Sequence, residues 1–240
     1  MSEPQWSGPG IMQSFVTLKE GSKITQETLD RWFEEVYVPE LIKTGIVTAA
    51  SIWKAANPAY EKQNMILYEA PDLAPIKQGK LREDHVSRKS DMFPTDGPVD
   101  DFVDVESRIL AREEYYEIEK QPKDVATTVI YAAMQPSPGG EVDLDKWYRE
   151  EHNEQMSKEP GWKRTIRYRL LFQTRNDGKE AEGLDFLAIH EFDEKNKLGQ
   201  NVQPLEPITD WTKKAMSECK SIDAAIYHKV TSSFRLAVSR

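Results

Sequence analysis

In the second half of the chain, apolar residues recur at helical spacing in a stretch that also contains two ionisable residues. The i, i+3, i+4, i+7 pattern between Leu144 and Met156 predicts an amphipathic helix over residues 143–159, capped by Asp143 and ended by Pro160-Gly161. Its apolar side also carries Glu151 and His152. Burial of such groups costs free energy unless each has a partner or faces a cavity, so this helix is the first candidate for a functional site.

The same pattern occurs earlier in a weaker form. Residues 29–41 align with residues 144–156 without a gap, and Trp32 falls on Trp147. At the two polar positions, Val36 and Tyr37 stand where the second stretch has Glu151 and His152. A repeat at this separation predicts two related units, each the size of a small domain.

Runs of alternating or continuous apolar residues predict further strands and helices around these two helices, in two similar sets. A flexible arm (1–11) is expected first, then a unit at 12–120 and a second unit at 124–240. Each unit reads β-α-β-β-α-β, which predicts an α+β fold of two tandem ferredoxin-like repeats whose open sheet faces pack together into a barrel. The expected strands are 12–18, 47–55, 63–69, 103–117, 125–135, 163–174, 184–192 and 223–232, and the expected helices are 25–43, one or two segments in 71–90, 143–159 and 207–220.

One predicted strand carries mixed charges on a single face. Glu106, Arg108, Arg112 and Glu114 alternate with other residues and therefore point to the same side of the sheet. These charges either pair across the contact between the two sheets or are solvated at an edge, and the sequence leaves both possibilities open.

Composition excludes several classes of function. The formal net charge of −9 argues against nucleic-acid binding, which needs clustered Lys and Arg. No apolar run is long enough to cross a membrane, and the N-terminus does not resemble a secretory signal. Cys219 is the single cysteine, so neither an internal disulfide nor a CxxC metal site is possible. We therefore expect a cytoplasmic protein without membrane partners.

The motif Trp147-x3-Glu151-His152, followed by Pro160-Gly161-Trp162, resembles the EthD-like proteins of the dimeric α/β-barrel superfamily. The first repeat is similar to a decayed copy, because Tyr37-Val38-Pro39 keeps the family's proline and lacks its histidine. The tandem layout is similar to that of uncharacterised fungal EthD-domain proteins. The resemblance implies an intramolecular dimeric α/β barrel, that is, a monomer with an internal pseudo-dimer, for which further dimerisation stays open. The superfamily includes cofactor-free cyclases and decarboxylases, monooxygenases, lactone isomerases, haem enzymes and members without a known reaction, so the fold does not select a function.

With this resemblance, the second repeat supplies the candidate chemistry. His152 is expected to act as a general base near neutral pH, with His190 on a nearby strand as a second candidate. A tyrosine hydroxyl could hold an enolate or phenolate oxygen. The expected catalytic residues are His152, His190 and Tyr168, and the expected substrate-binding residues are Trp147, Tyr148, Glu151 and Tyr131.

These residues suggest a cofactor-independent tailoring enzyme, such as a cyclase, isomerase or decarboxylase, acting on a small hydrophobic carbonyl or polyketide-like substrate. No ligand spacing supports a metal site at His152, Glu151 and His190, so neither metal nor cofactor is expected. The alternative is a non-catalytic binding or accessory protein in which both histidines are structural. A cavity beside His152 would favour the enzyme, and a closed helix–sheet contact would favour the binding protein.

Overall fold

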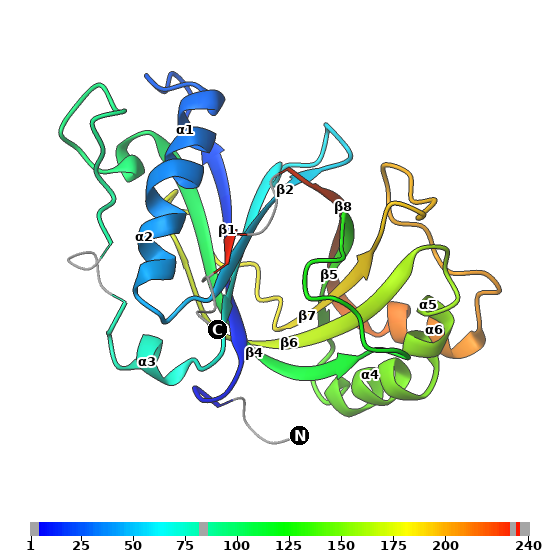
Figure 1. Cartoon of the computed structure of the whole chain (residues 1–240). Coiled ribbons are helices and arrows are strands. Elements are labelled where there is room, and N and C mark those ends of the chain that lie inside the picture. The colour runs from blue at the N-terminus through cyan, green and yellow to red at the C-terminus, as the bar shows by residue number, and fades with distance from the viewer. Residues whose placement is uncertain (1–4, 82–85, 231–233, 236–240) are drawn as a thin grey trace.

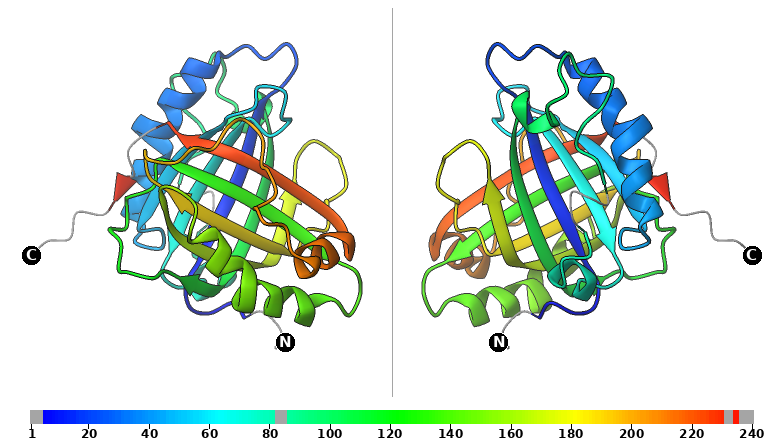
Figure 2. Two further views of the ribbon diagram at one scale, coloured as in Figure 1. Left: turned by 90° about the vertical axis from the view of Figure 1, so that its right-hand side faces the viewer. Right: turned by 90° about the vertical axis from the view of Figure 1, so that its left-hand side faces the viewer.

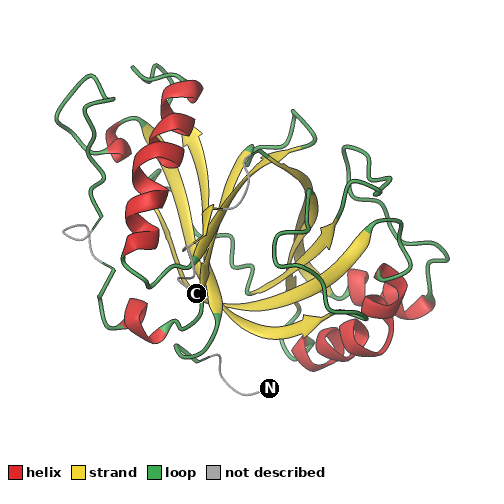
Figure 3. Cartoon of the chain, in the orientation of Figure 1, coloured by secondary structure: helices red, strands yellow, loops and turns green. Residues whose placement is uncertain are grey.

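Eight antiparallel strands close into a barrel, and the helices lie on its outside (Figures 1 and 2). The computed structural model describes residues 5–81, 86–230 and 234–235. Figure 3 shows the separation of the layers, with the helices placed around the strands rather than between them. The predicted α+β barrel is therefore confirmed. The origin of its halves as tandem repeats stays a prediction.

Each half of the barrel is a four-stranded sheet with the same strand order. In chain order, the fourth strand of each half lies next to the first, the first next to the third and the third next to the second. The halves join through β4–β6 and β2–β8 pairing, which leaves no open sheet edge between them. The first half contains β1 (Gly10–Leu18), β2 (Ala49–Ala55), β3 (Asn64–Ala70) and β4 (Val103–Tyr116), and the second contains β5 (Thr128–Pro136), β6 (Trp162–Arg175), β7 (Phe186–Phe192) and β8 (Cys219–Lys229).

The first helix of each half contains a π-helical turn at the same place. In the first half, α1 (Gln26–Trp32) continues through η1 (Phe33–Tyr37) into α2 (Val38–Lys43). In the second, α4 (Glu141–Trp147) continues through η3 (Tyr148–His152) into α5 (Asn153–Met156). The π-helical turns end at Tyr37 and His152, the two residues that the repeat alignment pairs. Such turns often occur at functional sites.

The start of the second-half helix differs from the prediction. The helix begins at Glu141 with Gly140 at the N-cap position, so the assignment of Asp143 as N-cap is wrong. The Asp143 carboxylate lies within the first turn and instead forms an ion pair with Lys214 at 3.2 Å. At the other helix end, Gly161 has a φ of +80°, which agrees with the predicted stop.

The two halves differ in what covers the sheet beside this helix. In the second half, α6 (Asp210–Ser217) packs against α4. In the first half, the described part of the connection from β3 to β4 has only the short helix α3 (Ala74–Lys77) and a 3₁₀ turn, η2 (Val99–Asp101). Of the one or two helical segments predicted in 71–90, the described residues contain one, α3, and Gly79 shortly after it has a φ of +71°. His85 lies outside the described residues.

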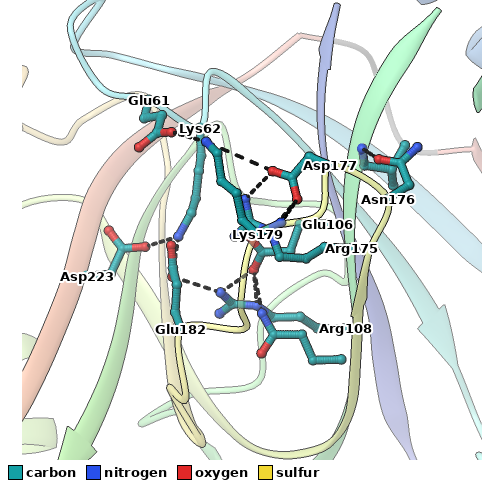
Figure 4. A network of polar contacts seen from close by, with 12 residues as sticks. Glu61, Lys62, Glu106, Arg108, Arg175, Asn176, Asp177, Lys179, Glu182 and Asp223 are labelled. Carbon is teal, nitrogen blue, oxygen red and sulfur yellow. Dashed lines mark hydrogen bonds and ion pairs between the residues drawn. The ribbon is translucent and has the colours of Figure 1, made fainter. Parts of the chain in front are cut away.

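The barrel interior is apolar in its middle and ionic at one end. Inward-facing residues such as Phe15, Met65, Leu110 and Tyr227 form the apolar cluster. At one end, the side chain of Arg108 is fully buried and donates from Nε to Glu106 at 2.6 Å (Figure 4). Arg108 also donates from Nη1 to the Tyr131 hydroxyl at 2.8 Å.

This ionic end joins the two halves. Arg108 also reaches Glu182 of the second half at 3.1 Å, and Glu182 accepts from Lys62 at 2.6 Å. Lys62 in turn pairs with Asp223 at 2.6 Å (Figure 4). We call Glu106, Arg108, Tyr131, Glu182, Lys62 and Asp223 the Arg108 network. Glu106 and Arg108 are two of the mixed charges on one face of the predicted strand. They pair inside the barrel and are not solvated at an edge.

The end of the chain returns to the first half. β9 (Phe234–Arg235) pairs antiparallel with β2 through Ala49 and Ala50. Of residues 231–240, this two-residue strand is the part that the structure describes.

Candidate functional site

His152 and His190 meet between the second-half helix and the outer face of the sheet. Their ring centroids are 5.4 Å apart. The His152 ring stacks on Trp147 at 4.2 Å and lies edge-on to Tyr148. His190 Nδ1 shares a 2.8 Å hydrogen bond with the Thr165 hydroxyl. His152 Nδ1 is buried and has no hydrogen-bond partner among the described residues, while part of the His152 side chain remains exposed.

The surroundings of both histidines favour the neutral imidazole. Burial, followed by the positive charge of Arg167, lowers the pKa of His152 to about 3. Burial also lowers the pKa of His190 well below its usual value, and His152 and Arg167 add to this shift. A base with such a low pKa is weak at neutral pH.

The lowered pKa of His152 predicts a loss of stability in acid. Between pH 6.5 and about 3, the unfolded chain binds a proton that the folded chain does not, so the free energy of unfolding falls as the pH falls. From pH 7 to pH 4.5, we expect His152 to account for a loss on the order of 2 kcal/mol. Urea unfolding of the protein and of His152→Phe at both pH values measures this difference. Equal losses in the two proteins would show that His152 is readily protonated in the fold.

Two of the remaining candidates on this helix, Trp147 and Glu151, contact α6. Glu151 Oε1 accepts hydrogen bonds from the hydroxyls of Thr209 at 2.6 Å and Thr212 at 3.0 Å. Thr212 Oγ1 also accepts from Trp147 Nε1 at 3.2 Å. Tyr148 packs under the guanidinium of Arg167 at 4.4 Å. Glu151 is therefore held by its hydrogen bonds to α6, whereas His152 lies against Trp147, Tyr148 and His190.

Tyr131 and Tyr168 lie on the opposite face of the sheet from the histidines. Both point into the barrel, where Tyr131 joins the Arg108 network and Tyr168 lies in the apolar cluster. Burial raises the pKa of both hydroxyls. The sheet separates them from His152 and His190, so the structure does not bring the predicted catalytic residues together in one site.

A cavity occupies the corresponding helix–sheet space of the first half. Its volume is about 390 Å³, within the usual range for small-molecule sites. One wall is the helix, with Trp32, Phe33 and Tyr37, and the other is the outer face of β1, β3 and β4, with Ser14, Ser107 and Tyr68. We call this space the first-half cavity.

Trp32 belongs to this wall and has a buried polar atom without a partner among the described residues. The Trp32 side chain is 0% exposed, and its Nε1 has no hydrogen-bond acceptor among the described residues. The matching atom of the second half, Trp147 Nε1, donates to Thr212 of α6. A buried indole N–H usually has an acceptor, so the first-half cavity is suited to a ligand that supplies one.

The opposite side of the cavity is polar. Arg88 binds Asp100 through two hydrogen bonds of 2.6 Å. Burial acts to raise the pKa of Asp100, but Arg88 outweighs it and the pKa is lowered. Burial, with the nearby Tyr37, raises the pKa of Tyr68 well above its usual value, although a hydrogen bond from Ser14 and the charge of Arg88 oppose the shift. Tyr68 therefore remains protonated near neutral pH.

Coverage by α6 explains why one half is hollow and the other closed. In the second half, the outward-facing residues Thr165, Ala188 and His190 are at most 2% exposed. In the first half, Ser14 and Ser107 occupy central strands and are still partly exposed. In the first half, described residues of the connection between β3 and β4, such as Arg88, Val99 and Asp100, line the cavity without filling it.

Comparison with known proteins identifies the fold. No family model and no curated protein matches the sequence. Among solved structures, an anthrone oxidase-like protein is 13% identical, with a TM-score of 0.56 over 100% of this chain and 99% of its own. A putative monooxygenase from Fusobacterium nucleatum is 11% identical, with a TM-score of 0.57 over 97% of each chain. A putative chlorite dismutase is 12% identical, with a TM-score of 0.51 over 93% of this chain and 95% of its own.

The chain shares its antiparallel α+β barrel fold with these proteins. Two further observations concern this barrel. Within the described residues, no helix is both long and apolar enough to cross a membrane. The same part of the chain contains no group of three or more His, Cys, Asp or Glu side chains arranged to hold a metal ion.

Reasoning from the sequence did not single out the residues that line the first-half cavity. The repeat alignment contained a signal, because it pairs Tyr37 with His152, and Tyr68 aligns with His190 on the third strand of each half. Trp32 and Trp147 also align. The alignment pointed to the space between helix and sheet in both halves. The second half was predicted to hold the site because it has the histidines.

Proposed function

We propose that this chain binds a small aromatic carbonyl compound in the first-half cavity. The observation that carries the proposal is the buried Trp32 Nε1, which has no acceptor among the described residues and lies in the wall of a cavity of about 390 Å³. A carbonyl oxygen is a suitable acceptor for this N–H.

The rest of the cavity fits the same ligand. Tyr37 stacks on Trp32 with ring centroids 4.9 Å apart, and Phe33 lies edge-on to Tyr37, so the helix side presents an aromatic wall. Such walls favour flat aromatic rings. On the sheet side, Tyr68 and Arg88 supply polar groups that can fix the orientation of a bound oxygen. The names of similar structures, which include monooxygenases and an anthrone oxidase-like protein, also favour a small-molecule ligand.

A second candidate function keeps the predicted acid–base chemistry in the second half. In it, His152 and His190 serve a cofactor-independent cyclase, isomerase or decarboxylase that acts on a small hydrophobic carbonyl substrate. The partly exposed His152 ring and its unbonded Nδ1 favour this candidate. The lowered pKa of both histidines and their tight contacts with Trp147 and Tyr148 oppose it.

Calorimetric binding of 1-tetralone, an aromatic ketone, tests the first proposal. We expect 1-tetralone to bind and Trp32→Phe to weaken its binding about tenfold, because one hydrogen bond to the ketone is lost. Tetralin, which lacks the oxygen, should be affected much less by this substitution.

Trp147→Phe is the matched control, since it makes the same change at the aligned position of the closed half. Its affinity for 1-tetralone should stay close to that of the unmodified protein. Absence of 1-tetralone binding, or a larger loss in Trp147→Phe than in Trp32→Phe, would contradict the assignment of the cavity.

A further inference from the structure

The inside of the barrel contains a second cavity at the end opposite the Arg108 network. Its volume is about 410 Å³, and the wall of the sheet separates it from the first-half cavity, which lies on the outer face. The Arg108 network occupies the other end with ion pairs, so this cavity lies away from them.

The depth of this barrel cavity is apolar. Inward-facing residues from five strands line it, including Ile11, Trp53, Leu67, Ile166 and Ile189. Tyr168 also lines it, is 7% exposed, and makes no hydrogen bond through its hydroxyl to a described residue. The cavity therefore offers an apolar wall with one buried polar group that a ligand can reach.

The charged residues that line this cavity are four cations, Arg112, Lys123, Arg164 and Lys229, and three carboxylates, Glu69, Asp124 and Glu191, so the rim has an excess of positive charge. Arg164 pairs with Glu191 at 2.6 Å, and Lys229 pairs with Asp124 at 2.8 Å. Arg112 and Lys123 also line the rim, are exposed, and form no ion pair with a described residue. Arg112 instead lies over the Tyr115 ring, 5.5 Å from its centroid. Two cations are therefore available at the mouth of an apolar cavity.

We propose that the barrel cavity binds a small hydrophobic carboxylate. The carboxylate lies at the rim, where Arg112 and Lys123 neutralise it, and the apolar body enters the barrel toward Tyr168. Arg can bind a carboxylate through two parallel hydrogen bonds. This site is separate from the proposed carbonyl site and does not depend on it.

Isothermal titration of the full chain with decanoate and with decanol tests this proposal. We expect decanoate to bind more tightly than decanol, and its affinity to fall as NaCl is added, because rim charges are screened by salt. The double variant Arg112→Gln/Lys123→Gln should lose at least about tenfold in affinity for decanoate, with little change for decanol. Both residues are exposed, so the variant should fold.

Two controls locate the binding site. Lys146→Gln/Lys213→Gln removes two positive charges from the exposed surfaces of α4 and α6, which do not line this cavity, and should keep decanoate binding. Ser107→Phe, which fills the first-half cavity, should also keep it. The proposal is overturned if decanoate does not bind, if the Arg112/Lys123 variant binds as well as the unmodified protein, or if Ser107→Phe abolishes binding.

Discussion

Replacing Arg108 with alanine is expected to lower the free energy of unfolding by about 3–5 kcal/mol. The Arg108 side chain is 0% exposed and lies between Glu106, Glu182 and the Tyr131 hydroxyl. Without Arg108, the buried carboxylate of Glu106 has less positive charge beside it. It also removes a link between the two halves, since Glu182 belongs to the second.

Urea unfolding at neutral pH measures this loss. Arg149→Ala is the control, because Arg149 also contacts two carboxylates, Glu114 and Asp145, and its side chain is 48% exposed. Such an exposed arrangement should contribute about 1 kcal/mol or less. If both substitutions lower the free energy of unfolding by the same amount, the buried Arg108 network stabilises the barrel no more than an exposed ion pair does.

Ser107→Phe is expected to weaken 1-tetralone binding by at least about a hundredfold. Ser107 lies on β4 and faces the first-half cavity, where its hydroxyl is 3.3 Å from that of Ser14. A phenyl ring at this position occupies the space that the ligand needs. Because the ring enters an existing cavity, stability should change by only about 1 kcal/mol.

Calorimetric titration of the variant with 1-tetralone gives this result directly. Ser137→Phe adds the same ring at an exposed turn of the second half and should bind 1-tetralone like the unmodified protein. Retained binding by Ser107→Phe would place the ligand outside the first-half cavity.

Much of the fold could be predicted because the local and global signals agree. In segments such as 163–174, the alternation of residue types matches the inward and outward faces of β6. The two aligned helices each pack against the sheet of their own half. The segment 71–90 was different. Its composition is compatible with a helix, but Gly79 adopts a positive φ and the residues beyond 85 form turns before β4.

The candidate site was harder to predict, since its state depends on packing between distant segments. The sequence places a tryptophan on each first helix, but it does not show which indole N–H finds an acceptor. That outcome depends on Thr212, which α6 brings to Trp147, whereas no described residue of the first half supplies an acceptor to Trp32. Histidine at positions 152 and 190 indicated chemistry, whereas the space for a ligand lies beside the aligned Tyr37 and Tyr68.

The indole N–H resonances of ¹⁵N-labelled protein test the central proposal most directly. Trp32→Phe and Trp147→Phe assign two of the six tryptophans. We expect 1-tetralone to move the Trp32 indole proton to lower field, as a new hydrogen bond does, and to leave Trp147 in place; tetralin should produce no such shift. A shift of Trp147 with Trp32 unchanged would place the ligand beside His152 instead and contradict the proposed site.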